Sequence, residues 1–141
     1  MNANVRAHLR NAHERLKDAK GMVSLSRYAG TVNRTYYVMF EAASAMLSAV
    51  DVEVETHYGV KIKFGELFVK TGRVDPKFGR DLSRALDLRE DADYAVDSRA
   101  EVPREVAEEQ LQKASEFLRM AEEFLEAAEG KHETGQSTQA L

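Results

Sequence analysis

The sequence predicts an all-α protein, built as an antiparallel up-and-down bundle of four to five helices. Only two prolines and eight glycines occur in 141 residues, which is too few turn residues for an all-β chain. Hydrophobic residues make up 43% of the chain, enough for a core. They recur at three- and four-residue steps in long segments joined by short connections, which is the pattern of a helical bundle.

The first two helices are expected over residues 4–23 and 26–50. In the first, Val5, Leu9 and Ala12 begin an apolar face at helical spacing. The second is apolar around most of its circumference, which is typical of a helix that contacts several neighbours or lies at a subunit interface. We therefore expect the second helix at the centre of the bundle and a homodimer in solution.

A loop is expected over residues 51–59, where the helical pattern stops. A short helix over residues 61–71 follows, and Gly72 suits its C-terminal cap. Asp75 followed by Pro76 is a combination that starts a helix, because the missing N–H of proline has no partner to lose at the first position.

Two longer helices complete the predicted bundle. One runs from the Asp-Pro pair to about residue 95, and the other begins near Pro103 and should stop at Gly130. Residues 131–141 are polar and show no periodicity. We therefore expect a disordered C-terminal tail after a domain that spans residues 1–130.

The net charge of −4 is unevenly distributed. Residues 61–90 hold eight Lys/Arg against five Asp/Glu, and residues 101–129 hold three against nine. This balance excludes a generic polyanion binder, but it fits one face for phosphates and another that repels them. The alternative is two ordinary solvated helix surfaces.

Composition excludes several classes of chemistry. The chain has no cysteine, which rules out disulfides, zinc–thiolate sites and cysteine nucleophiles. No carboxylate–histidine cluster has metal-ligand spacing, so we expect no metal and no other cofactor. No apolar run approaches the ~20 residues of a membrane span. Charges near the N-terminus argue against a secretory signal, so we expect a cytoplasmic protein without membrane contact.

The fourth helix carries the most informative polar residues. Lys77, Arg80 and Arg84 follow helical spacing and form one basic ridge. Arg89 and Asp93 continue an apolar face, where charged residues are costly unless they are paired or bind a ligand. Two explanations stay open: an internal Arg89–Asp93 pair at (i, i+4) spacing, or an arginine held in a cleft for a phosphate.

His57 is the histidine of most interest, because it lies in the expected loop just before the basic segment. It could contact a phosphate there, or it could pack in the loop without a functional role. His8 and His13 are five residues apart and do not share a helix face, so we do not expect them to bind a metal together.

Four short segments form a recognisable set. They are residues 33–43 (NRTYYVMFEAA), 57–59 (HYG), 68–72 (FVKTG) and 88–94 (LREDADY). They occur in order and, with the C-terminal helix, span about residues 4–128. Together they resemble small prokaryotic proteins of the HEPN-domain family.

The resemblance implies a four- or five-helix bundle that dimerises and belongs to a toxin–antitoxin or stress-response pair, with a minimal nucleotidyltransferase as partner. Several such proteins are metal-independent RNA endonucleases whose motif is an Arg and a His with four to six residues between them. Here Tyr94 stands at the shortest-spaced histidine position after Arg89. Tyrosine has a pKa of about 10 and is a poor base at neutral pH. The nuclease site is therefore expected to be altered or lost, and the enzymatic activity stays open.

Two functions follow from this resemblance. The first is a component that acts on or binds RNA or nucleotide phosphates; the alternative is a non-catalytic helical module that binds the nucleotidyltransferase. In the first, Arg89 supplies charge to the phosphate, Asp93 orients it and Tyr94 donates a hydrogen bond. Further candidates for phosphate or nucleic-acid contacts are Asn33, Arg34, His57, Lys70, Lys77, Arg80 and Arg84.

Overall fold

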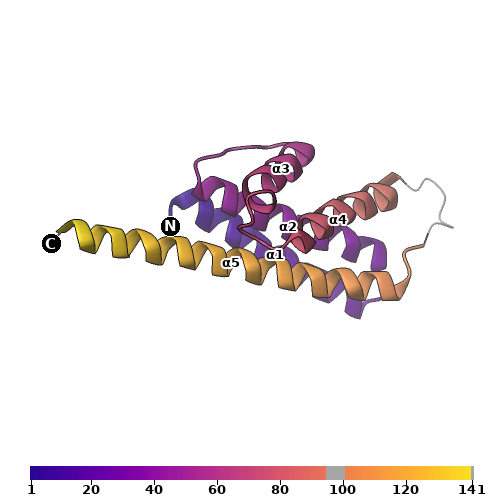
Figure 1. Ribbon diagram of the computed structural model, residues 1–141. Helices are drawn as coiled ribbons and strands as arrows, with labels where there is room; N and C mark the ends of the chain where they lie inside the picture. The colour runs from indigo at the N-terminus through magenta and orange to yellow at the C-terminus, as the bar shows by residue number, and fades with distance from the viewer. Residues whose placement is uncertain (95–100, 141) are drawn as a thin grey trace.

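The computed structural model describes residues 1–94 and 101–140, with side chains for residues 1–93 and 101–130. All regular elements in this part of the chain are helices, which confirms the all-α prediction (Figure 1). The elements are α1 (Ala3–Ser24), α2 (Tyr28–Ala49), α3 (His57–Phe64), the π-helical segment η1 (Gly65–Val69), α4 (Pro76–Tyr94) and α5 (Arg104–Ala140).

The hairpin of α1 and α2 forms where the sequence places its first two helices. The side chain of Asn2 accepts a hydrogen bond from the backbone N–H of Val5 at 2.8 Å and caps α1. A short connection with Ser26 in the left-handed region joins the two helices. Helix α2 contacts each of the other four α-helices, which confirms its predicted central place.

Helix α3 begins earlier than the sequence predicts. Residues 57–59 are helical and not part of a loop, because the side chain of Thr56 accepts a hydrogen bond from the N–H of Gly59 and caps the helix. His57 is therefore the first residue of α3. This start fixes the histidine on a helix that packs against α2.

The connection from η1 to α4 matches the prediction. Gly72 has a φ of +74°, in the left-handed region that favours glycine, and its N–H donates to the carbonyl of Val69. The Asp75 side chain accepts a hydrogen bond from the N–H of Lys77 at 2.9 Å, and Pro76 is the first residue of α4.

The sequence predicts that the last helix stops at Gly130, and this prediction is wrong. In the structure, α5 continues past Gly130 to Ala140. A glycine inside a helix costs only about 1 kcal/mol relative to alanine, which the flanking helix-forming residues can offset. In Figure 1 the C-terminal part of α5 extends beyond the rest of the bundle. The division into a domain over residues 1–130 and a disordered tail stays a prediction.

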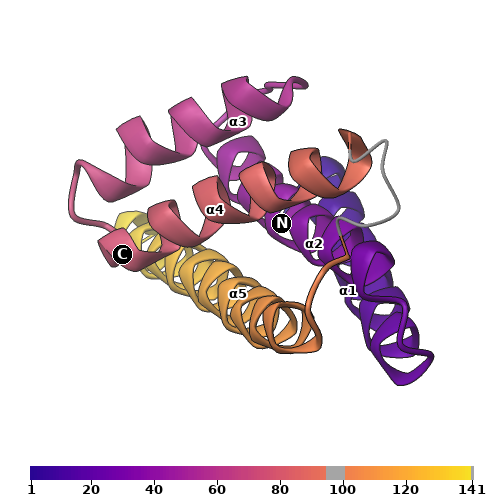
Figure 2. The same ribbon diagram turned by 90° about the vertical axis from the view of Figure 1, so that its right-hand side faces the viewer.

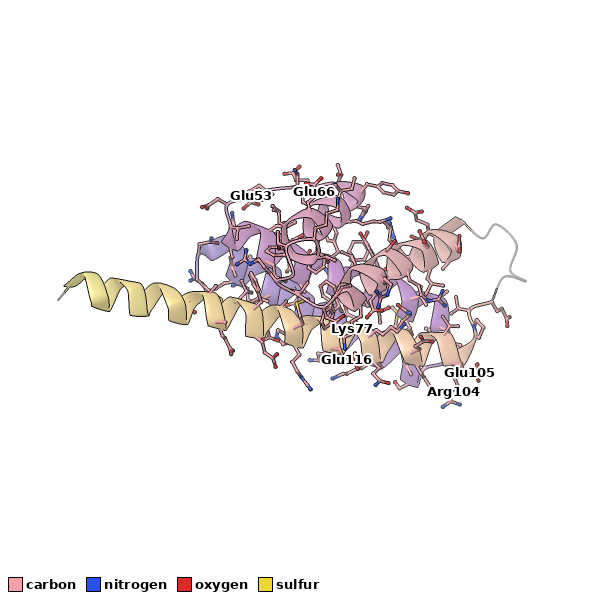
Figure 3. The ribbon with its side chains drawn as sticks, viewed as in Figure 1. Glu53, Glu66, Lys77, Arg104, Glu105 and Glu116 are labelled. Carbon is pink, nitrogen blue, oxygen red and sulfur yellow. The ribbon has the colours of Figure 1, made fainter. Side chains whose placement is uncertain are left out.

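The helices form two layers, in which α3 and α4 lie over α1, α2 and α5 (Figure 2). The large buried side chains between them include Tyr36, Phe64 and Phe117. Charged side chains such as Glu66 and Arg104 project from the outer surface (Figure 3). Within the described residues, no helix combines the length and the hydrophobicity that a membrane crossing would need.

Candidate anion-binding site

A cluster of aromatic rings lies where α3 meets α2. The imidazole of His57 packs against the rings of Tyr36, Tyr37 and Phe40, with centroid separations of 5.4, 5.9 and 5.1 Å. The hydroxyl oxygen of Tyr36 lies 2.7 Å from Nδ1 of His57, and the two groups form a hydrogen bond. The first residue of α3 is therefore held by three rings of α2.

Arg89 of α4 completes this group. Its guanidinium carbon lies 5.6 Å from the centre of the Tyr36 ring and 5.4 Å from that of Tyr37, both within cation–π range. Arg89 and His57 thus share two aromatic neighbours. We refer to Tyr36, Tyr37, Phe40, His57 and Arg89 as the Arg89 cluster.

Arg89 and Asp93 form the ion pair that was one of the two explanations for their spacing in the sequence. Nε of Arg89 lies 3.0 Å from Oδ2 of Asp93. That Nε is buried, and its alignment with the carboxylate does not meet hydrogen-bond geometry. The terminal N–H groups of Arg89 have no acceptor among the described residues, and 20% of the side chain is exposed. These donors are therefore available to an anion from outside.

Burial sets the protonation of the two polar rings. It raises the pKa of Tyr36, against the opposing charge of Arg89, so this hydroxyl keeps its proton at neutral pH. Burial lowers the pKa of His57, and Arg89 lowers it further, while Glu90 has the opposite effect. His57 is therefore uncharged at neutral pH, and the positive charge of the cluster comes from Arg89.

Exposed apolar surface continues from the cluster along α3. The hydroxyl of Tyr58, the residue after His57, donates a hydrogen bond to Oε1 of Glu90 at 3.0 Å, and Tyr58 is 57% exposed. Ile62, one turn further along, is 54% exposed. Nζ of Lys61 lies 5.9 Å from the centre of the Tyr58 ring.

The structure brings together three of the predicted site residues, His57, Arg89 and Asp93. Tyr94 is the last residue of α4, and its side chain lies outside the described residues. The prediction that Tyr94 donates a hydrogen bond therefore stays a prediction.

Of the other predicted contact residues, Asn33 and Arg34 lie on α2, within about one turn of Tyr36 and Tyr37. Arg34 donates a hydrogen bond to the side chain of Asn33, and its Nε lies 3.9 Å from Asp18 of α1. Four basic residues are exposed, one after η1 and three along α4, and their predicted role in phosphate binding stays a prediction. They are Lys70, Lys77, Arg80 and Arg84.

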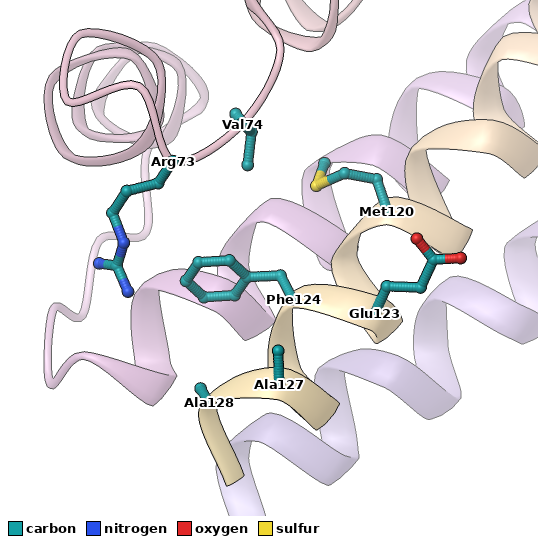
Figure 4. A pocket seen from close by; sticks show the side chains of 7 residues that line it. All are labelled: Arg73, Val74, Met120, Glu123, Phe124, Ala127 and Ala128. Carbon is teal, nitrogen blue, oxygen red and sulfur yellow. The ribbon is translucent and has the colours of Figure 1, made fainter. Parts of the chain in front are cut away.

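A second arginine lies over aromatic rings, just before the start of α4. The guanidinium carbon of Arg73 lies 4.8 Å from the centre of the Phe124 ring and 5.6 Å from that of Phe68. Arg73 lines a hollow of about 430 Å³. The other lining residues, shown in Figure 4, are Val74, Met120, Glu123, Phe124, Ala127 and Ala128. Among the residues whose side chains the structure describes, no tyrosine or histidine lines this hollow.

Sequence reasoning missed Tyr36, Tyr37 and Phe40 as residues of the site. It included them only in the 33–43 segment of the family resemblance, on a helix that it described as apolar around most of its circumference. One signal was available, because a buried tyrosine needs a hydrogen-bond partner for its hydroxyl. A tyrosine on the central helix could therefore have been matched with a nearby histidine.

The fold and the site are those of an all-α helical bundle with an arginine and a histidine held by aromatic rings. The domain description of the HEPN family matches residues 5–124 of this chain. The protein therefore belongs to the HEPN domain family, as the sequence segments predicted.

Proteins from several prokaryotes are similar to this chain. A UPF0332 protein of Thermotoga maritima is 39% identical over 85 residues, which cover 60% of this chain and 64% of that protein. Two proteins of Methanocaldococcus jannaschii carry the names "Putative toxin MJ0605" and "Putative toxin MJ0142". The first is 33% identical over 97 residues, covering 69% of this chain and 72% of that protein. The second is 30% identical over 105 residues, covering 74% of this chain and 70% of that protein.

Proposed function

We propose that this protein is a toxin-type component of a toxin–antitoxin or stress-response pair and that it binds RNA or nucleotide phosphates at the Arg89 cluster. The observation that carries the proposal is the Arg89 guanidinium, held over Tyr36 and Tyr37 beside His57. The names of the two Methanocaldococcus jannaschii relatives support the toxin assignment.

A phosphate suits this arrangement on chemical grounds. The planar guanidinium offers two parallel N–H donors that match two phosphate oxygens. The tyrosine rings hold its plane, so less conformational freedom is lost when an anion binds. Asp93, whose side chain is 38% exposed, would compete with the phosphate for Arg89 and keep the free protein electrically balanced.

The proposal requires binding and does not require cleavage. Tyr94 replaces the histidine of the nuclease motif, so we propose a degenerate nuclease site. The purified protein should be incubated with total RNA, with and without a chelator, and its binding to single-stranded RNA should be titrated. Binding without new RNA ends fits the proposal. Absence of RNA and nucleotide binding at low salt would refute it.

A homodimer forms part of the proposal, with Tyr58 and Ile62 of α3 at the contact between the subunits. Both side chains are more than half exposed, which is uncommon for large apolar residues on neighbouring turns. Light scattering should give twice the monomer mass for the natural protein, and Ile62→Lys should give the monomer. A natural protein that stays monomeric at micromolar concentration would contradict this part.

The alternative function is a non-catalytic module that partners a minimal nucleotidyltransferase. The acidic surface of α5 favours it, because residues 101–129 hold nine acidic against three basic side chains. Co-purification from host cells should then recover such a partner in a complex that dissociates as salt is raised. Recovery of the homodimer alone at low salt would exclude this alternative.

A further inference from the structure

The hydrogen bond between Tyr36 and His57 has a direction that burial decides. Tyr36 is only 1% exposed, and Nδ1 of His57 is the one acceptor that its hydroxyl has among the described residues. If Nδ1 carried a proton and donated it, the hydroxyl proton of Tyr36 would be left buried without an acceptor. A buried unpaired donor is costly, so the hydroxyl donates and Nδ1 accepts.

This direction fixes the neutral form of His57. An uncharged imidazole has one nitrogen that accepts and one that carries the proton. Because Nδ1 accepts from Tyr36, the proton must lie on Nε2. Nε2 has no hydrogen-bond acceptor among the described residues, and His57 is half-buried. This N–H can therefore donate a hydrogen bond to a ligand.

We infer that Tyr36 is a positioning residue that holds His57 in the Nε2–H tautomer, so that the site binds an oxyanion through donors from both Arg89 and His57. This inference rests on the proposed function for the identity of the anion, a phosphate group of RNA or a nucleotide. It adds a second donor to the site and a residue, Tyr36, that controls it without touching the ligand.

The first test uses the protein alone. The nitrogen chemical shifts of His57, measured by NMR above the pKa of this residue, distinguish the two tautomers. The natural protein should show nearly pure Nε2–H. Tyr36→Phe keeps the ring and removes the hydroxyl, so it should shift His57 toward the tautomer mixture of a solvated histidine. Tyr37→Phe is the matched control, because its hydroxyl has no bond to His57, and it should leave the shifts unchanged.

The second test measures the affinity for a short single-stranded RNA oligonucleotide. His57→Ala removes the second donor and should weaken binding by roughly tenfold or more. His57→Gln places an amide N–H near the position of Nε2 and should recover most of that loss. Tyr36→Phe should lie between the natural protein and His57→Ala.

The outcomes separate the inference from the proposed function. The inference would be overturned if Nδ1–H were the main tautomer of the natural protein. It would also be overturned if His57→Ala and His57→Gln lost RNA affinity equally, even if Arg89 were essential for RNA binding. Equal RNA binding by Arg89→Ala and the natural protein would overturn the proposed function, while the NMR result would still decide the role of Tyr36. If the natural protein binds no RNA, a phosphate of RNA is excluded as the ligand both in the proposed function and in the inference.

Discussion

Two arginines near opposite ends of α4 are held in the same way but have different surroundings. The guanidinium of Arg73 lies over Phe68 and Phe124, and that of Arg89 lies over Tyr36 and Tyr37. Most of the length of α4 separates them, about 20 Å at 1.5 Å per residue.

The difference lies in the hydroxyl groups of the rings. The phenylalanines beside Arg73 offer an apolar surface and a negative ring face, which attract a cation but cannot form a hydrogen bond through a hydroxyl. A tyrosine beside Arg89 also donates a hydrogen bond, and that bond orients His57. The same stacking therefore serves packing at one end of α4 and forms part of the candidate anion-binding site at the other.

The strongest test of this comparison removes each arginine in turn. Arg89→Ala should weaken RNA binding by roughly 10- to 100-fold, because a charge-assisted phosphate contact is lost. Arg73→Ala should change the affinity by less than about fivefold, the range of an exposed charge. Binding titrations with helicity checked by circular dichroism measure both.

Arg10→Ala on α1 is the control for the loss of one positive charge, because α1 does not pack against α4. If Arg89→Ala lowers the melting temperature but binds RNA normally, Arg89 and Asp93 are a structural pair and the site assignment is wrong.

The second test addresses the other end of α4. Phe124 contacts the Phe68 ring at 5.1 Å and is partly buried. Phe124→Ala should lower the free energy of unfolding by about 2 kcal/mol, less than for a fully buried phenylalanine. RNA affinity should stay unchanged. Urea unfolding measures the free energy of unfolding. If a folded Phe124→Ala variant lost RNA binding, the two ends of α4 would not have separate roles in packing and in binding.

The third test concerns the arginine over these rings. Arg73→Ala should lower the free energy of unfolding by about 0.5–1 kcal/mol, the usual contribution of an exposed cation–π contact. Arg73→Lys should keep part of this stabilisation. A neutral effect of both substitutions on urea unfolding would show that the stacking at this end has no measurable energy.

The smallest expected effect is a pH dependence at the Arg89 end. Tyr36, Tyr37 and Phe40 of α2 and Arg89 and Glu90 of α4 surround His57, and burial with Arg89 lowers its pKa in the fold. The unfolded chain then binds the proton first as pH falls. The stabilisation from neutral His57 is complete above the unfolded pKa of about 6.5 and is lost as pH falls through the lower pKa of the folded state.

Urea unfolding from about pH 8 to about pH 5 measures this dependence. His57→Gln should show a smaller loss of stability on acidification than the natural protein. Equal losses would assign the pH dependence to groups other than His57.

The helices and their order along the chain could be predicted from the sequence. Local signals indicate these features: the cap at Asp75 and the left-handed Gly72 are each readable in a few consecutive residues, and the apolar pattern around most of α2 repeats along the helix itself. The sequence also predicted the Arg89–Asp93 spacing, because residues four apart on a helix meet whatever else surrounds them.

Which residues meet in the candidate site depends on tertiary packing. The hydroxyl of Tyr36 meets His57 across 21 positions of the chain, and Arg89 reaches the same rings from α4. Helical periodicity counts Tyr36 as an apolar residue and gives no partner for its hydroxyl. That partner depends on how α3 and α4 pack over α2, since a hydrogen bond needs two atoms within about 3 Å and no local pattern sets that distance.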